Sequence, residues 1–245
     1  MIVAQRRRLD QALVERGLVT SRERAQAMVR AGLVRVAGAP TERPDQLVAA
    51  DQPIEITGAR DYVSRGGEKL AAALDAFAVD PRDRTCLDVG ASTGGFTDVL
   101  LQRGAERVIA VDVGYGQLAW SLRQDPRVTV IERVNIRHLE QLPQPADLAV
   151  IDVSFISLRL VLPRVRELLR PPGDVVALVK PQFEVGKGAV GKGGVVRDPA
   201  QHDQVLNELR RFAAEIGYQV AGQIPSPVLG TKGNREFLLY LKPHA

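Results

Sequence analysis

LDVGASTGGFTD, residues 87–98, is the stretch that decides how the rest of this chain is interpreted. It opens with a short apolar run, breaks into small residues, and resumes with Phe96, Val99 and Leu100 at helical spacing. This pattern predicts a buried strand, a tight glycine turn and the start of a helix. Glycine lets the backbone come close to a ligand, and the helix N-terminus behind it offers free N–H groups. The stretch therefore indicates a ligand-binding turn in an α/β domain.

A second apolar run follows at 108–111 and ends in Asp112. An acidic residue at the end of the second strand commonly binds the hydroxyl pair of a ribose. The turn lacks the G-x-G-x-x-G spacing that cradles a pyrophosphate, which argues against a dinucleotide. The alternative is a strand–helix turn without a ligand. The positions of Asp88, Gly90, Gly94 and Asp112 favour a nucleoside site.

Length and composition limit the possible classes of protein. The 245 residues, 45% of them hydrophobic, suffice for one large domain or for a small and a medium one. No apolar run reaches the roughly 20 residues that span a membrane, and no signal-peptide core follows the first charges. Cys86 is the only cysteine, and the three histidines lie far apart. We therefore expect a cytoplasmic protein with no metal site and no membrane partner, and the sequence carries no indication of its oligomeric state.

Positive charge is concentrated near the N-terminus. The formal net charge is +4, and residues 1–60 hold ten arginines against seven acidic residues. A basic module of this kind favours a polyanionic partner. The alternative is an ordinary solvated surface.

The first quarter of the chain has its own pattern of elements. Helices are expected at 8–16 and 21–32, with Ser21 as the N-cap, followed by strands near 33–36 and 53–56 and a turn at 38–40. The patterns RLDxxL, SRxxA and GxVxVxG in this region resemble the α-L fold, a small RNA-binding domain of a ribosomal protein and of pseudouridine synthases. The resemblance implies arginines that contact RNA phosphates. The candidates are Arg6, Arg7, Arg8, Arg22, Arg24 and Arg30.

Strands and helices alternate through the rest of the chain. The expected strands are 84–89, 107–111, 128–131, 147–152, 174–180, 218–224 and 235–242. The expected helices are 70–77, ended by Pro81, and 95–103, 116–123, 157–169 and 200–215. This alternation predicts a doubly wound parallel sheet, and the short connection 226–234 predicts that the last two strands pair antiparallel. The expected domains are 1–60, a linker and leading helix at 61–82, and 83–245.

Polar residues stand at the expected carboxyl ends of the strands, where ligands bind in such sheets. They are Asp88 and Gly90, then Asp112, Asn135, Asp152 and Lys180. A lysine that ends an apolar strand is unusual, because burial penalises its charge. It could extend to solvent. Alternatively, a partly desolvated lysine near Asp152 can lose its proton and act as a base.

The strings that carry a wider resemblance are SRGGEKL (64–70), DVGASTGGFT (88–97), VDVGYGQL (111–118), SFISL (154–158) and VKPQFE (179–184). Together they resemble the TlyA family of ribosomal RNA 2′-O-methyltransferases, often called hemolysin A. Lys69, Asp152, Lys180 and Glu236 are similar to the catalytic Lys-Asp-Lys-Glu tetrad of RNA ribose 2′-O-methyltransferases. The resemblance implies a class I S-adenosylmethionine-dependent methyltransferase fold, Rossmann-like and seven-stranded, behind the small α+β RNA-binding domain.

The resemblance also implies a mechanism, an in-line displacement in which a cytidine ribose 2′-hydroxyl attacks the methyl group of S-adenosylmethionine. Lys180 would take or polarise the proton, Asp152 and Glu236 would orient the lysines, and Lys69 would help place the ribose. The cofactor's methionine end would lie at Asp88, Gly90, Ser92, Thr93 and Gly94, its ribose at Asp112 and its adenine near Asn135. The substrate would be ribosomal RNA within a ribosomal subunit. Because the chain ends soon after the expected last strand, it resembles shorter members that act on the large subunit.

Residues 186–192 fit the spacing G-x-x-x-x-G-K, but Gly193 follows in place of Ser or Thr and no helix comes next. This excludes a phosphate-binding P-loop, and leaves a basic lid over the RNA or a plain flexible loop. The sequence disfavours two other functions. A non-catalytic RNA-binding assembly factor is disfavoured by the intact tetrad, and a membrane-active hemolysin by the lack of insertion segments.

Overall fold

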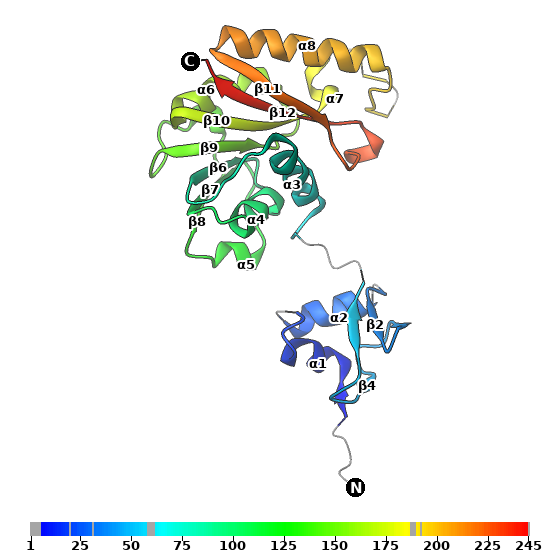
Figure 1. Ribbon diagram of the computed structural model, residues 1–245. Coiled ribbons are helices and arrows are strands. Elements are labelled where there is room, and N and C mark those ends of the chain that lie inside the picture. Colours follow the sequence, from blue (N-terminus) through cyan, green and yellow to red (C-terminus); the bar gives the residue numbers. More distant parts are fainter. Residues whose placement is uncertain are drawn as a thin grey trace. The chain divides into compact units, whose positions relative to one another are not determined.

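The computed structural model describes residues 6–19, 21–30, 32–57, 62–186, 190–191 and 193–244. The chain divides into two compact units, residues 1–60 and 61–245, and Figure 1 shows both. Most of the segment interpreted as a basic lid or a flexible loop, residues 187–189 and 192, lies outside the described part.

Two short helices form one layer of the N-terminal unit. They are α1 (Leu9–Glu15) and α2 (Arg22–Arg30), and both confirm the predicted helices. The hydroxyl of Ser21 accepts a hydrogen bond from the N–H of Arg24 at 3.2 Å, which is the expected capping contact. The core between the helices and strands includes Leu9, Leu13, Ala25, Val29 and Val34.

The sheet of this unit has one strand more than predicted. The strands β2 (Val34–Val36), β3 (Ala39–Thr41) and β5 (Ile54–Ile56) are ordered β3-β2-β5, and β1 (Arg7–Arg8) pairs separately with β4 (Leu47–Val48). The predicted turn at 38–40 is wrong, because Ala37 and Gly38, both with positive φ, make a two-residue hairpin turn instead. Such turns require positive φ at both central positions.

Helix α3 (Arg65–Phe77) opens the second unit. It begins at Arg65 rather than at Leu70, with Ser64 as its N-cap, and it ends at Ala78, which has φ +51°, before Pro81 is reached. Close packing on α4 (Gly95–Gln102) explains why the glycines are helical here. A Cβ on Gly95 would lie 2.9 Å from the backbone nitrogen of Gly67. Packing of α3 against α4 therefore overrides the low helix propensity of glycine.

A seven-stranded sheet forms the centre of the second unit (Figure 1). Its order is β11-β12-β10-β9-β6-β7-β8, and β12 runs antiparallel to both neighbours, so the predicted sheet and its antiparallel last strand are confirmed. The strands are β6 (Thr85–Val89), β7 (Arg107–Asp112), β8 (Val128–Glu132), β9 (Ala146–Ile151), β10 (Leu169–Val179), β11 (Tyr218–Pro225) and β12 (Phe237–Pro243). The remaining helices are α5 (Trp120–Arg123), α6 (Leu162–Leu168), α7 (Pro181–Glu184) and α8 (Pro199–Glu215).

Two predicted helices are shorter than expected. Only Trp120–Arg123 of the segment 116–123 is helical, and Gly116 has a positive φ that helices do not use. The segment 157–169 is divided into a 3₁₀ turn at Leu158–Leu160 and α6. Pro163 lies in the first turn of α6, where proline is tolerated because no N–H is needed there.

Alternate residues of the strands face two separate cores. Leu87 and Val89 of β6 belong to the core that includes α6 and α8, whereas Cys86 belongs to the core that includes α3 and α4. Since β6, β7, β9 and β10 are parallel, their carboxyl ends lie at one edge of the sheet. Antiparallel β12 begins at that same edge, so the predicted site residues are brought there together.

Candidate active site

A cavity of about 760 Å³ lies at the carboxyl ends of β6, β7 and β9. Of the predicted cofactor residues, Gly90, Ser92, Asp112 and Asn135 line it. A Cβ on Gly90 would lie 2.5 Å from the carbonyl oxygen of Asp152, and Gly90 has φ +86°. Only glycine fits there, because both the conformation and the space exclude a side chain. The turn after β6 is thus packed directly against the end of β9.

Asp112 is held by backbone groups at the end of β7. Its Oδ2 accepts a hydrogen bond from the N–H of Ser92 at 2.8 Å, and its Oδ1 accepts one from the N–H of Gly114 at 2.6 Å. A carboxylate oxygen can accept more than one hydrogen bond. Asp112 is therefore oriented towards the cavity and can still accept hydroxyl groups.

The remaining predicted cofactor residues lie around the turn. Asn135 caps a 3₁₀ turn (Ile136–His138), because its Oδ1 accepts a hydrogen bond from the N–H of Arg137 at 3.1 Å. Thr93 is exposed but does not line the cavity, and Gly94 is the N-cap of α4 with φ +95°. These two residues shape the turn rather than the cavity wall.

Asp88 lies beneath the turn and not in the cavity. It has no exposed surface, and the hydroxyl of Thr97 in α4 donates to its Oδ2 at 2.6 Å. Burial raises its pKa to about 7, so that the neutral acid is substantially populated at neutral pH. Its place in β6 explains this position, since alternate residues of that strand face the α3 and α4 side.

Lys180 and Asp152 form an ion pair at the ends of neighbouring strands. Nζ of Lys180 lies 2.6 Å from Oδ1 of Asp152 and donates a hydrogen bond to Oγ of Ser154 at 2.8 Å. The lysine side chain is only 11% exposed, so it does not extend to solvent. Asp152 and Ser154 both line the cavity, which places the ammonium group beside it.

Lys69 and Glu236 form the second pair. Nζ of Lys69 donates to Oε2 of Glu236 at 2.5 Å, and the two side chains are 11% and 2% exposed. The residues are 167 positions apart, and α3 and the start of β12 bring them together. In the register of β10 with β12, Val179 faces Phe237, so Lys180 and Glu236 occupy the next opposed positions.

Helix α3 carries one residue of the second ion pair and also lies close to the first. A Cβ on Gly66, in the first turn of α3, would lie 3.9 Å from Oδ2 of Asp152. The helix that carries Lys69 therefore packs against the carboxylate that holds Lys180. Two ammonium groups, each paired with its own carboxylate, thus lie at the edge of the sheet where the cavity is found, and Asp152 of the first pair lines the cavity itself.

Comparison with known proteins assigns the family. The FtsJ-like methyltransferase family matches residues 62–243, and the S4 domain matches residues 7–54. The 16S/23S rRNA (cytidine-2′-O)-methyltransferase TlyA of Mycobacterium tuberculosis is 50% identical, over 98% of this chain and 91% of that protein. This chain is a TlyA-type FtsJ-like methyltransferase. The predicted class I methyltransferase fold with an N-terminal RNA-binding domain is thereby confirmed.

Two further proteins are similar to this chain over nearly its whole length. The candidate rRNA methyltransferase YqxC of Bacillus subtilis is 49% identical, over 98% of this chain and 87% of that protein. The structure of a candidate hemolysin of Streptococcus thermophilus has a TM-score of 0.75 and 43% identity, and covers 99% of this chain and 90% of that one. Within the described ranges of the methyltransferase, no helix is both long and apolar enough to cross a membrane.

The predicted RNA-binding arginines of this methyltransferase lie in its N-terminal unit. Arg8 and Arg22 both contact Asp10, whereas Arg7 pairs with Glu15 at 2.5 Å. The other three, all exposed, are Arg6, Arg24 and Arg30. The structure thus brings together two of the six predicted arginines through one shared carboxylate.

Sequence reasoning did not single out the turn that carries Glu236. Asn234 is 2% exposed, and its side chain accepts a hydrogen bond from the N–H of Val196 at 3.1 Å and donates to the carbonyl of Gly194 at 3.0 Å. A Cβ on Gly230 would clash with the carboxylate of Glu236. The only sequence signal for either residue was its proximity to Glu236.

An aromatic pair at the cavity mouth was also missed. Phe155 is 90% exposed with φ +64°, and its ring centroid lies 5.0 Å from that of Phe183. Both residues line the cavity. An exposed phenylalanine in the left-handed region is a costly arrangement that often accompanies function, but no sequence pattern reveals a backbone angle.

Proposed function

We propose that this chain transfers a methyl group from S-adenosylmethionine to the ribose 2′-hydroxyl of a cytidine in ribosomal RNA. The observation that carries the proposal is the set of two lysine–carboxylate ion pairs at the edge of the sheet where the cavity lies. Lys180 with Asp152 and Lys69 with Glu236 are both largely buried at one edge of the sheet. Membership of a family of RNA ribose methyltransferases supports the same chemistry, and so does a buried lysine that lies beside a nucleoside-sized cavity.

The chemistry of the residues that line the cavity suits S-adenosylmethionine. Asp112 would accept the two ribose hydroxyls, since backbone N–H groups already fix its orientation. Gly90 leaves its backbone bare at the turn, where the methionine end would lie, and Asn135 would lie near the adenine. S-adenosylmethionine, when bound, supplies a methyl group on a sulfonium that needs no further activation.

Lys180 would act on the proton of the ribose hydroxyl. Its ammonium group is held by Asp152 and Ser154, so its position is fixed before the substrate arrives. In the amine form, Nζ would take the hydroxyl proton as a general base; in the ammonium form, it would donate a hydrogen bond to the hydroxyl oxygen and so polarise the O–H bond. Lys69, fixed by Glu236, would place the ribose. Alignment and proton removal would then carry most of the acceleration.

The substrate is inferred from the relatives and from the N-terminal unit. The name of the Mycobacterium relative covers cytidines of both 16S and 23S rRNA. An S4 domain with exposed arginines supports an RNA substrate for this chain as well. We propose large-subunit RNA within a ribosomal subunit as the target, which would place the protein in the cytoplasm.

The test is methyl transfer from labelled S-adenosylmethionine to ribosomal subunits that lack the modification. Wild type is compared with Lys180→Ala and with Lys242→Ala, an exposed lysine of β12 outside the cavity lining. We expect label at one alkali-resistant linkage of large-subunit RNA, and a loss of about 100-fold or more with Lys180→Ala only.

Three results would contradict parts of the proposal. Label on a base, or no transfer by wild type to either subunit, would overturn the 2′-O chemistry. Full activity of Lys180→Ala would overturn the role of the lysine. Label in small-subunit RNA as well would overturn only the restriction to the large subunit.

A further inference from the structure

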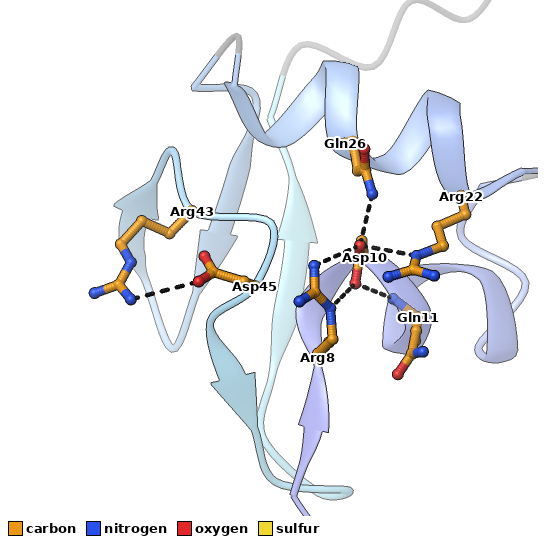
Figure 2. A network of polar contacts seen from close by, with 7 residues as sticks. All are labelled: Arg8, Asp10, Gln11, Arg22, Gln26, Arg43 and Asp45. Atoms are coloured by element: carbon orange, nitrogen blue, oxygen red, sulfur yellow. Dashed lines mark hydrogen bonds and ion pairs between the residues drawn. The ribbon is translucent and has the colours of Figure 1, made fainter.

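A buried carboxylate organises two arginines of the N-terminal unit. Asp10, in the first turn of α1, has no exposed surface. Its Oδ1 accepts hydrogen bonds from Arg8 Nε at 3.1 Å and from the N–H of Gln11 at 3.0 Å. Its Oδ2 accepts from Arg8 Nη2 at 3.1 Å, from Arg22 Nε at 3.0 Å and from Gln26 Nε2 at 2.9 Å. Figure 2 shows the side chains of Arg8, Arg22 and Gln26 converging on this carboxylate.

The two guanidinium groups keep donors for another partner. The side chains of Arg8 and Arg22 are 40% and 49% exposed. Arg22 uses only Nε towards Asp10, and Arg8 uses Nε and Nη2. Among the described residues, the two Nη groups of Arg22 and Nη1 of Arg8 have no hydrogen-bond partner. The cluster holds two positive charges and one negative charge, and its exposed part is the positive one.

Sharing one carboxylate fixes the arginines before any ligand arrives. A free surface arginine samples many rotamers and loses that entropy when it binds. Arg8 and Arg22 have lost it already on folding, because Asp10 holds both side chains. A guanidinium matches the geometry of phosphate oxygens and binds them strongly. A preordered pair would therefore bind a phosphodiester at a lower entropic cost than two independent arginines.

We propose that Asp10 is a positioning residue that holds Arg8 and Arg22 as one preorganised pair for the phosphate oxygens of RNA. The inference rests on the proposed RNA substrate and identifies how the N-terminal unit would bind it. It gives an acidic residue a favourable role in binding a polyanion, although its own charge repels phosphate.

Because the charge of Asp10 repels phosphate, removing that charge tests the proposal. Asp10→Asn removes a negative charge at nearly constant shape, so electrostatics alone predicts tighter RNA binding. Loss of positioning predicts weaker binding, because the amide nitrogen of Asn cannot accept from an arginine. Asp45→Asn is the matched control, since it removes the same charge from an exposed side chain whose ion pair, among the described residues, is with Arg43 at 3.7 Å.

The measurement is binding of the full chain to fluorescent 23S rRNA fragments at several salt concentrations. We expect Asp10→Asn to lower affinity about tenfold and to reduce the slope of log K against log salt by about 1 to 2, and Asp45→Asn to leave the affinity equal or slightly higher, as its lost negative charge alone predicts. Equal or tighter binding by a folded Asp10→Asn variant would overturn the positioning role alone. Absence of salt-dependent binding by wild type would overturn both the RNA substrate and this inference.

A double-variant test separates positioning from general structure. In a background with Arg8→Gln and Arg22→Gln, adding Asp10→Asn should no longer weaken binding. A further loss of affinity in that background would mean that Asp10 acts through the fold rather than through the arginines, and would overturn the proposal.

A measurement on wild type remains decisive if Asp10→Asn fails to fold. The Nε–H groups of Arg8 and Arg22 should exchange slowly and show restricted motion in ¹⁵N NMR. Arg24 is exposed, and its side chain has no hydrogen-bond partner among the described residues, so its Nε–H should exchange rapidly. Equal mobility of the three guanidinium groups would overturn the proposal.

Discussion

Among the described residues, each unit buries one aspartate completely, and the two carboxyl groups are in opposite electrostatic states. Asp10 accepts five hydrogen bonds, and the Arg8 guanidinium above all holds the pKa of this carboxyl well below its usual range. Asp88 accepts one side-chain hydrogen bond, from Thr97, and within the described residues its Oδ1 has no partner. Burial raises its pKa to about 7.

The difference shows that burial alone does not decide whether an acid is charged. Both side chains have an exposed fraction of 0%. The desolvation cost of a carboxylate is offset only where cationic and N–H donors satisfy its oxygens. Asp10 retains its charge and holds arginines, whereas Asp88 is readily neutralised and supports a turn. Four predictions test this contrast, from the largest expected effect to the smallest.

Asp10→Ala should destabilise residues 6–57 by about 3 kcal/mol, because it leaves two adjacent guanidiniums without their shared carboxylate. Residues 1–60 contain no aromatic residue, so hydrogen exchange of peptides from this unit is the suitable measurement. Asp45→Ala is the control and should cost less than about 0.5 kcal/mol, as exposed ion pairs do. Equal exchange in the two variants would show that Asp10 is not the stabilising centre.

Thr97→Val should destabilise the second unit by about 2 kcal/mol at pH 8 and by about 1 kcal/mol at pH 5. The hydroxyl of Thr97 donates to Asp88, and a hydrogen bond to an ionised carboxylate is stronger than one to a neutral acid. Denaturant unfolding followed by hydrogen exchange at the two pH values measures the difference. A cost that does not depend on pH would show that Asp88 keeps one protonation state.

The stability of the second unit should fall as pH rises towards 7. Asp88 takes up its proton near pH 7 when folded and at about pH 4 when unfolded, so between these values the folded state binds more protons. The contribution of Asp88 to this slope should reach at most about 1.4 kcal/mol per pH unit, and it should vanish above pH 8. Asp10 has a lowered folded pKa, so its contribution is constant in this range and is lost only as pH falls below about 4.

Asp88→Asn should change the free energy of unfolding near pH 4, where Asp88 is neutral in the folded state, by less than about 1 kcal/mol. The amide is neutral, as the protonated acid is, and its oxygen can still accept from Thr97. The same variant should remove the pH slope described above, which makes it the control for that profile. A loss of several kcal/mol would mean that the folded state needs the charge of Asp88, and an unchanged slope would mean that another group produces it.

Much of the fold could be predicted because it follows from local patterns. The strand ends and the short 226–234 connection were sufficient to place Asp152 beside Lys180 and to reverse β12. The third strand of the N-terminal sheet was missed, since Ala37 gives no signal for its positive φ. The early start of α3 was missed because glycine is a poor helix former, and only the contact with α4 stabilises a helix there.

The candidate site was less accessible to the same reasoning. The pairing of Lys69 with Glu236 joins residues 167 apart, and it was expected only through the resemblance to a family. The place of Asp88 beneath the turn was not foreseen, because a sequence shows that a residue ends a strand but not which face it takes. Asp10 was counted merely as an acidic residue among arginines, since a list of charges does not show which of them share a partner.

The position of β12 has a consequence for the order in which the protein is made. This strand lies between β10 and β11 but is synthesised after both, and Glu236 stands at its start. Domains generally fold as units from the N-terminus during translation. The arginine-bearing unit would therefore be complete on the ribosome while the sheet still has a gap and Lys69 still lacks its carboxylate. A nascent chain would acquire the RNA-binding unit before it acquires its methyl-transfer chemistry.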